Sequence, residues 1–136
     1  EPKIFIDDYA HHPNEIISVY NSLKTLYPNK KKLVIFQPHL FSRTKDFMSE
    51  FAEALEKFDK IALLDIYPAR EKPIEGITSQ SILDKINNTN KVLLNKNDIK
   101  DLLSNDDHEL VVSMGAGDIG DLVEIIKKII TDQNEN

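Results

Sequence analysis

Five short runs of bulky apolar residues constrain the fold of this chain more than any other feature. They lie at residues 3–8, 32–37, 61–67, 91–95 and 109–114. The runs are nearly continuous and do not alternate with polar residues, which is typical of strands covered on both faces of a sheet. Between them, apolar residues recur at the three-and-four spacing of amphipathic helices, at residues 14–27, 44–58, 79–86, 98–103 and 118–131.

This alternation predicts an α/β fold with a Rossmann-like, doubly wound and mostly parallel sheet. The 136 residues contain no internal repeat, so we expect one domain over residues 1–131 and a frayed polar tail at 132–136. The sequence starts at Glu1 without a methionine and enters a strand almost at once. We therefore expect it to be part of a longer protein.

Composition narrows the possible partners. A formal net charge of −6 argues against a non-specific nucleic-acid binder, which would normally be basic. The absence of cysteine excludes disulfides and thiolate sites, and fits a reducing compartment such as the cytoplasm. No apolar stretch approaches the roughly 20 residues that span a bilayer, and no signal peptide is visible. We expect small-molecule ligands, with no nucleic-acid or membrane partner.

Polar residues crowd the point where the first predicted strand ends. Residues 7–13 read DDYAHHP, and the carboxyl ends of parallel strands are where such sheets bind ligands. Asp8 could act near a phosphate, and Asn14 could cap the next helix and leave its N-terminus suited to an anion. The alternative is a capped, solvated turn. Because His11 and His12 are adjacent and lack a third ligand, we expect no metal site there.

Three further segments leave the same predicted edge. Residues 37–44 read QPHLFSRT, in which Arg43 offers a planar fork for a carboxylate or phosphate and Thr44 could cap a helix. The alternative for Arg43 is a surface pair with Asp46. The long loop at 68–78 is functional or mobile, or simply carries solvated charges. The MGAGD stretch at 114–118 falls short of a dinucleotide fingerprint, and is either a ligand-approach loop or a tight structural turn.

Together, the stretches DDYAHHP, FQPHLFSRTKDF, DIYPAREKPIEG and SMGAGDIG resemble, in order and spacing, the C-terminal domain of the bacterial Mur ligases. The likeness runs from Asp7 to about Ile130. Within the family, QPHxxSRT favours the members that join L-alanine to UDP-N-acetylmuramate over those that recycle murein peptides. The resemblance implies ATP and Mg²⁺ as cofactors and an acyl-phosphate intermediate in peptidoglycan precursor synthesis.

The resemblance also implies two domains that this sequence lacks, an N-terminal UDP-sugar domain and a central ATPase domain. No P-loop pattern occurs in the sequence, so we expect the domain alone to be inactive. Its partners would be those two domains, L-alanine, UDP-N-acetylmuramate and ATP. Mg²⁺ would be bound mainly by the central domain.

Individual roles follow from the same resemblance. His11 and Arg43 are expected to be catalytic residues beside the amino-acid substrate, with Arg43 binding its carboxylate and His39 lining the pocket. Asp8 would lie near the phosphate end of ATP, and Tyr9 near its adenine or ribose. Where many relatives have arginine this chain has Leu40, which places more weight on Arg43.

Two other classes of function were weighed. A stand-alone Rossmann-like regulatory module would hold Mg²⁺ at Asp7 and Asp8 beside a phosphorylated Asp65. Such a module needs a lysine after the fifth strand, where this chain has Gly115 and Ala116. A phosphoesterase using the paired histidines would need more acidic ligands than the strand ends provide.

Overall fold

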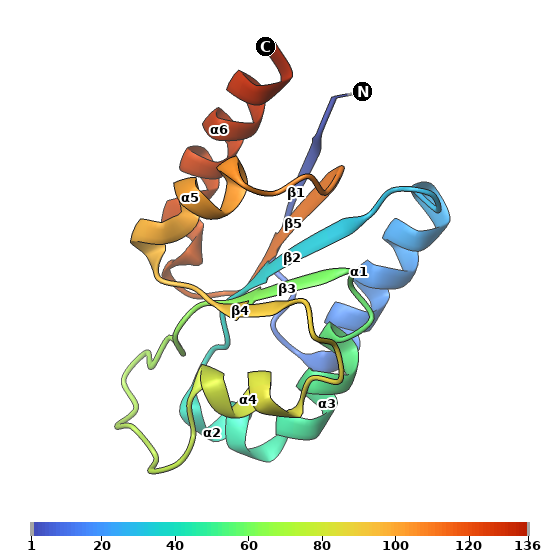
Figure 1. The fold of residues 1–136 in the computed structure, drawn as a ribbon. Coiled ribbons are helices and arrows are strands. Elements are labelled where there is room, and N and C mark those ends of the chain that lie inside the picture. The colour runs from blue at the N-terminus through green and yellow to red at the C-terminus, as the bar shows by residue number, and fades with distance from the viewer. Residues whose placement is uncertain (1, 136) are drawn as a thin grey trace.

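A five-stranded sheet forms the centre of the computed structural model, which describes residues 2–135 (Figure 1). Neighbouring strands pair in parallel in the order β1-β5-β2-β3-β4. Every residue of β2 and β5 is buried, as the continuous apolar runs predicted. The strands are β1 (Ile4–Asp8), β2 (Lys32–Phe36), β3 (Lys60–Leu63), β4 (Lys91–Leu93) and β5 (Leu110–Met114).

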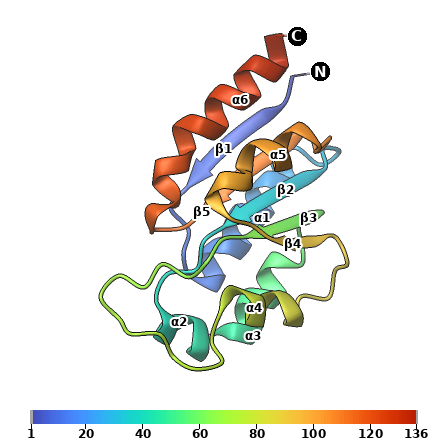
Figure 2. The same cartoon turned by 60° about the vertical axis from the view of Figure 1, so that its left-hand side comes forward.

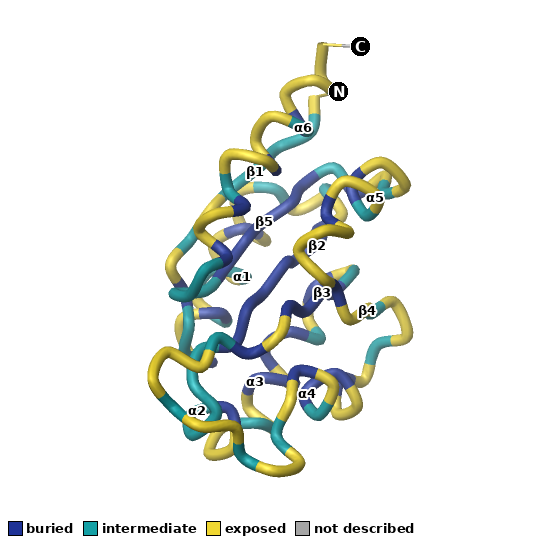
Figure 3. Tube along the Cα trace, turned by 90° about the vertical axis from the view of Figure 1, so that its left-hand side faces the viewer, coloured by how far each residue is buried: buried dark blue, intermediate teal, exposed yellow. Residues whose placement is uncertain are grey.

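Helices cover both faces of the sheet (Figures 1 and 2). One face carries α1 (Pro13–Leu26), α3 (Met48–Leu55) and α4 (Ser79–Lys85), and the other carries α5 (Ile99–Ser104) and α6 (Val123–Glu135). Because alternate strand residues point to opposite faces, Phe36 packs in the first core cluster and Ile35 in the second. Figure 3 shows the buried central strands β2 and β5 inside an exposed outer surface. The predicted doubly wound α/β fold is confirmed.

Some element bounds differ from the sequence prediction. The helix expected at 44–58 is two helices, α2 (Phe41–Asp46) and α3, separated at Phe47. The expected strand at 61–67 ends at Leu63, and the last helix is preceded by a 3-10 turn, η2 (Asp118–Leu122). A second 3-10 turn, η1 (Lys96–Asp98), precedes α5. The apolar stripe continues through the break at Phe47, so periodicity alone does not reveal it.

The C-terminal tail, for which we expected fraying, is helical in the described residues. α6 continues to Glu135, while residue 136 lies outside the described part. Asn134 Oδ1 accepts the Lys3 N–H at 2.7 Å, and Asn134 Nδ2 donates to the Lys3 carbonyl at 3.0 Å. Gln133 Nε2 donates to the Leu103 carbonyl at 3.0 Å. These hydrogen bonds hold the last turn of α6 against Lys3, just before β1, and against α5. They join residues far apart in the sequence, so no local pattern predicts them.

No helix within residues 2–135 has both the length and the apolar character needed to cross a bilayer.

We predict that Asn134→Ala lowers the free energy of unfolding by about 1 kcal/mol, because it removes both hydrogen bonds to Lys3. Urea denaturation of the chain measures the loss. Lys127→Ala is the matched control, since Lys127 is exposed on the same helix. Equal midpoints for Asn134→Ala and wild type would show that the tail is not held by these bonds.

Candidate functional site

Two loops run side by side beyond the carboxyl edge of the sheet. His39, after β2, forms a parallel bridge with Tyr67, after β3. Leu40 N donates to the Tyr67 carbonyl at 2.8 Å, and Tyr67 N donates to the Pro38 carbonyl at 2.8 Å. Leu40 adopts φ +75°, a region that costs energy for a residue with a side chain. The bonds to the neighbouring loop hold it in that conformation.

His11, His39 and Arg43, which we call the His–Arg cluster, come together at this edge from two segments, one after β1 and one after β2. The rings of His11 and His39 meet edge to face with centroids 6.3 Å apart. Arg43 Nη1 lies 3.3 Å from His39 Nδ1, and the His39 ring stacks on Tyr67 at 5.5 Å. The three residues expected to contact an amino-acid substrate are therefore neighbours in space. The alternative expected for Arg43, a pair with Asp46, is not formed within residues 2–135.

Hydrogen bonds assign the protons of the cluster. Arginine only donates, so His39 accepts at Nδ1 and carries its proton on Nε2. Burial first, and then the positive charges of Arg43 and His11, lower the pKa of His39, while Glu71 acts in the opposite direction. His11 Nδ1 donates to the Tyr9 carbonyl at 2.8 Å. At neutral pH the cluster thus combines a neutral His39 with the fixed positive charge of Arg43, which suits a carboxylate.

The start of α1 differs from the expectation. Its N-cap is His12, with Pro13 at the first helical position, so Asn14 is not the cap. Glu15 Oε1 accepts the N–H groups of His11 at 3.0 Å and His12 at 2.9 Å. The bond from His11 is the largest of the effects that lower the pKa of Glu15. A carboxylate of the chain itself therefore occupies the region that we expected to receive an external anion.

Asp8 and Tyr9 border a groove of about 580 Å³ that also includes His11. Asp8 Oδ1 accepts the Ala10 N–H at 2.9 Å, which closes a local turn. The Tyr9 side chain is 72% exposed, so its ring is open to a ligand. Asp8 and Tyr9 thus lie beside the His–Arg cluster, and their predicted contacts with ATP stay a prediction.

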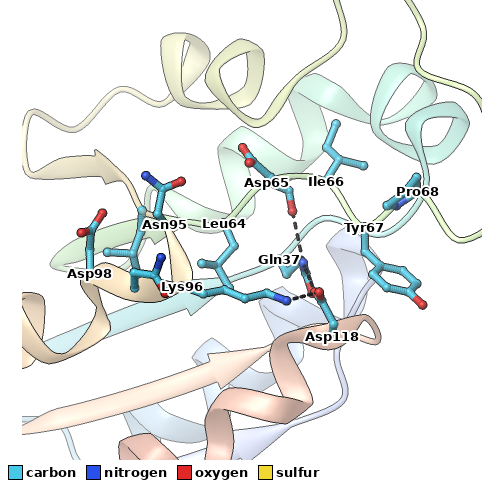
Figure 4. Close-up of a pocket in the computed structure, with 12 residues that line it drawn as sticks. Gln37, Leu64, Asp65, Ile66, Tyr67, Pro68, Asn95, Lys96, Asp98 and Asp118 are labelled. Carbon is cyan, nitrogen blue, oxygen red and sulfur yellow. Dashed lines mark hydrogen bonds and ion pairs between the residues drawn. The ribbon is translucent and has the colours of Figure 1, made fainter.

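Gln37 ties three strand ends together, as Figure 4 shows. Its buried side chain accepts the Ile119 N–H at 2.8 Å and donates to Asp118 Oδ1 at 2.6 Å and to the Asp65 carbonyl at 3.2 Å. Asp118 also pairs with Lys96. Burial alone would raise the pKa of Asp118, but the hydrogen bonds from Lys96 and Gln37 outweigh it and the pKa is lowered. The ends of β2, β3 and β5 are thereby locked to one another.

A cavity of about 530 Å³ lies between the ends of β3 and β4 (Figure 4). Tyr67, whose ring stacks on His39, forms part of its wall, so the cavity adjoins the His–Arg cluster. Apolar side chains and polar groups both line it, among them Leu64, Leu94, Asn95, Lys96 and Asp98.

The glycines of the GAGD stretch serve the chain's own packing. A Cβ at Gly117 would lie 2.6 Å from Gln37 Oε1 and from the Tyr67 side chain. Gly115 has φ +142°, and a Cβ there would lie 2.9 Å from the Gln37 carbonyl. Of the two alternatives, the structure supports the tight turn.

Several residues that hold the loops at this edge were not predicted from the sequence, or were predicted in another role. Thr44, expected as a helix cap, is instead buried inside α2 and donates to the Leu40 carbonyl at 2.8 Å. Glu71, considered as a solvated charge, accepts hydrogen bonds from Ser42. Only Gln37 could have been noticed in the sequence, because it is an amide directly after the apolar run LVIF of β2. The Ser42–Glu71 contact joins residues 29 apart and has no local signature.

We predict that Gln37→Leu destabilises the chain by about 2 to 3 kcal/mol, because it leaves the buried Ile119 N–H unpaired. Chemical denaturation measures the loss. Lys96→Met is the control and should cost less than about 1 kcal/mol, since its ion pair with Asp118 is partly exposed. A loss for Gln37→Leu no larger than that of the control would contradict the locking role of Gln37.

We predict that Arg43→Ala raises the pKa of His39 part of the way to its ordinary value. The guanidinium charge is removed while the burial, which is the larger cause, remains. Ring-proton NMR titration measures the change.

The lowered pKa of His39 also affects the pH dependence of stability. Because folded His39 binds a proton less readily than His39 of the unfolded chain, it contributes a loss of stability as the pH falls below about 6.5. The loss of stability at low pH should be smaller in Arg43→Ala than in wild type. An unchanged pKa of His39 in this variant would count against the Arg43–His39 contact.

Comparison with known proteins agrees with this architecture. The family model for the Mur ligase glutamate ligase domain matches residues 1–118. A UDP-N-acetylmuramate–L-alanine ligase from Christiangramia forsetii is 58% identical over 93% of this chain and 28% of its own length. One from Porphyromonas gingivalis is 49% identical over 96% of this chain and 29% of its own length. The chain thus spans less than a third of these relatives.

Solved structures share the fold at low sequence identity. The UDP-N-acetylmuramate-alanine ligase of Thermotoga maritima superposes with a TM-score of 0.70 and 23% identity, over 95% of this chain and 27% of that one. A murein peptide ligase from Psychrobacter arcticus gives a TM-score of 0.71 and 16% identity, over 93% and 27%. With a family match over most of its length, the chain belongs to the Mur ligase family, whose C-terminal domain it represents.

Proposed function

We propose that this chain is the closing, amino-acid-binding domain of an ATP-dependent ligase that joins L-alanine to UDP-N-acetylmuramate. The observation that carries the proposal is the His–Arg cluster, which places one fixed positive charge beside two histidines at the carboxyl edge. Support also comes from relatives named as this ligase that are 58% and 49% identical over nearly the whole chain.

In the proposed reaction, ATP phosphorylates the muramoyl carboxylate. The amine of L-alanine then attacks the acyl carbon, so that a C–N bond forms, the C–O bond to phosphate breaks and phosphate leaves. Arg43 would hold the L-alanine carboxylate by a charge-assisted, two-pronged contact. His39 and His11 would line the pocket and orient the amino acid. Nothing in this scheme requires a covalent nucleophile from the domain.

The nucleotide would approach from the side of Asp8 and Tyr9. The exposed ring of Tyr9 fits packing against adenine or ribose, and the Asp8 carboxylate offers an oxygen ligand near the phosphates. Mg²⁺, held mainly by the central domain, would neutralise phosphate charge when bound. This domain would add orientation and exclude water from the acyl phosphate by closing over it.

The murein-peptide recycling ligase is the less favoured assignment. The solved example shares the fold at only 16% identity, whereas the alanine ligases reach 58% over almost the same span. The QPHLFSRT stretch also fits the alanine-adding members better.

The proposal is tested by phosphate release from the full-length gene product with UDP-N-acetylmuramate, ATP and L-alanine. We predict that Arg43→Ala raises the KM for L-alanine by at least about tenfold, because a charge-assisted contact to its carboxylate is lost. The KM for ATP should stay within about twofold. Arg70→Ala, an exposed arginine of the 68–78 loop, is the control and should change neither value.

Two outcomes would contradict the proposal. Wild-type enzyme that releases phosphate no faster when L-alanine is added would overturn the assigned reaction. Equal increases of both KM values in Arg43→Ala would overturn the role of this arginine.

A further inference from the structure

The helix that carries Arg43 lacks a cap of its own. Its N-cap residue is Leu40, whose side chain makes no hydrogen bond to the helix and whose φ is +75°. The first N–H groups of a helix need partners, which a polar N-cap side chain normally supplies. Because α2 is only six residues long, its orientation depends strongly on what holds its first turn.

A carboxylate from the neighbouring loop supplies the missing cap. Glu71 Oε1 accepts the Ser42 N–H at 3.0 Å, and Glu71 Oε2 accepts the Ser42 hydroxyl. These two bonds from Ser42 are the largest causes of a lowered pKa of Glu71, with smaller contributions from Phe41 N–H and the Arg43 charge. Glu71 is therefore ionised and placed at the end of α2 where a negative charge is favourable.

The backbone conformation of the loop places the Glu71 carboxylate next to α2. Glu71 N donates to the Pro68 carbonyl at 2.9 Å, and Ala69 has φ +55°, so the chain turns sharply just before Glu71. The same loop is anchored one turn earlier, where Tyr67 bonds to Pro38 and Leu40. Glu71 thus approaches α2 from a backbone that is already fixed at its base.

The position of Glu71 also leaves the Arg43 guanidinium available. Both carboxylate oxygens of Glu71 are engaged by Ser42, and Arg43 turns instead to His39 Nδ1 at 3.3 Å. Within residues 2–135 no ion pair joins Glu71 to Arg43. The carboxylate therefore orients the helix without a direct bond to the Arg43 guanidinium, although the two charges still attract each other.

We infer that Glu71 is a positioning residue, which caps α2 from the adjacent loop and so fixes Arg43 for the substrate carboxylate. The inference rests on the proposed function for the identity of that substrate. The capping of α2 by Glu71 does not depend on the proposed function, because it follows from the contacts between the two loops.

The kinetic test uses the full-length ligase with three variants. Glu71→Ala should raise the KM for L-alanine roughly tenfold and leave the KM for ATP within about twofold, because only the arginine is misplaced. Glu71→Gln should recover most of the loss, since an amide can accept the Ser42 N–H and donate to the Ser42 hydroxyl. Glu75→Ala, an exposed acid of the same loop, is the matched control and should match wild type.

A double-mutant cycle separates this role from a general loosening of the loop. Ser42→Ala removes one of the two bonds, so it should add little to the effect of Glu71→Ala when both are combined. Additive effects, an unchanged KM for L-alanine in Glu71→Ala, or a Glu75→Ala effect of equal size would each overturn the inference.

A second readout needs no substrate and so distinguishes failure of the cap from failure of the proposed function. In this chain, Glu71→Ala should speed amide hydrogen exchange at Ser42 and Arg43, and Glu75→Ala should not. Unchanged exchange would overturn the inference whatever the enzyme does. If L-alanine does not increase phosphate release by the wild-type ligase, the proposed function is wrong. The hydrogen-exchange result still tests whether Glu71 caps α2.

Discussion

The candidate site at the carboxyl edge of this domain depends on one buried amide. Gln37 is the first residue after β2, and its side chain joins the β3 loop through Asp65 and the turn after β5 through Asp118 and Ile119. In a parallel sheet the backbone hydrogen-bond ladder stops where the strands stop. Gln37 extends the connection beyond that point. The loops that carry His39 and Tyr67 start from a base that this side chain fixes.

From that base the site is built by contacts between loops. The strained Leu40, the His39–Tyr67 stack and the Glu71–Ser42 bonds all join the segment after β2 to the segment after β3. Strained conformations of this kind persist only when the surroundings over-determine them. The charged Arg43 is therefore presented on a short helix whose first turn is held from outside. Preorganisation of this sort is what positioning a substrate carboxylate requires.

The fold was predictable because burial on both faces leaves a continuous apolar pattern at β2 and β5, and this pattern is local. The meeting of His11, His39 and Arg43 was predictable in outline, because parallel strands gather their carboxyl ends at one edge. What the sequence could not show depends on contacts between distant residues. Glu71 reaches Ser42 across 29 residues, and Asn134 reaches Lys3 across 131. The break between α2 and α3 at Phe47 also cannot be detected from the sequence, because the apolar periodicity continues through it.

The link between Asn134 and Lys3 has a mechanical consequence. It fastens the last turn of α6 to Lys3, the residue before β1, at the opposite end of the sheet from the His–Arg cluster. β1 spans five residues, or about 17 Å. A rotation of about 10° at the Lys3 end would carry the far edge by roughly 3 Å, which is about one hydrogen-bond length. A small rotation of the anchored end would therefore change hydrogen-bond distances at the edge that carries the His–Arg cluster.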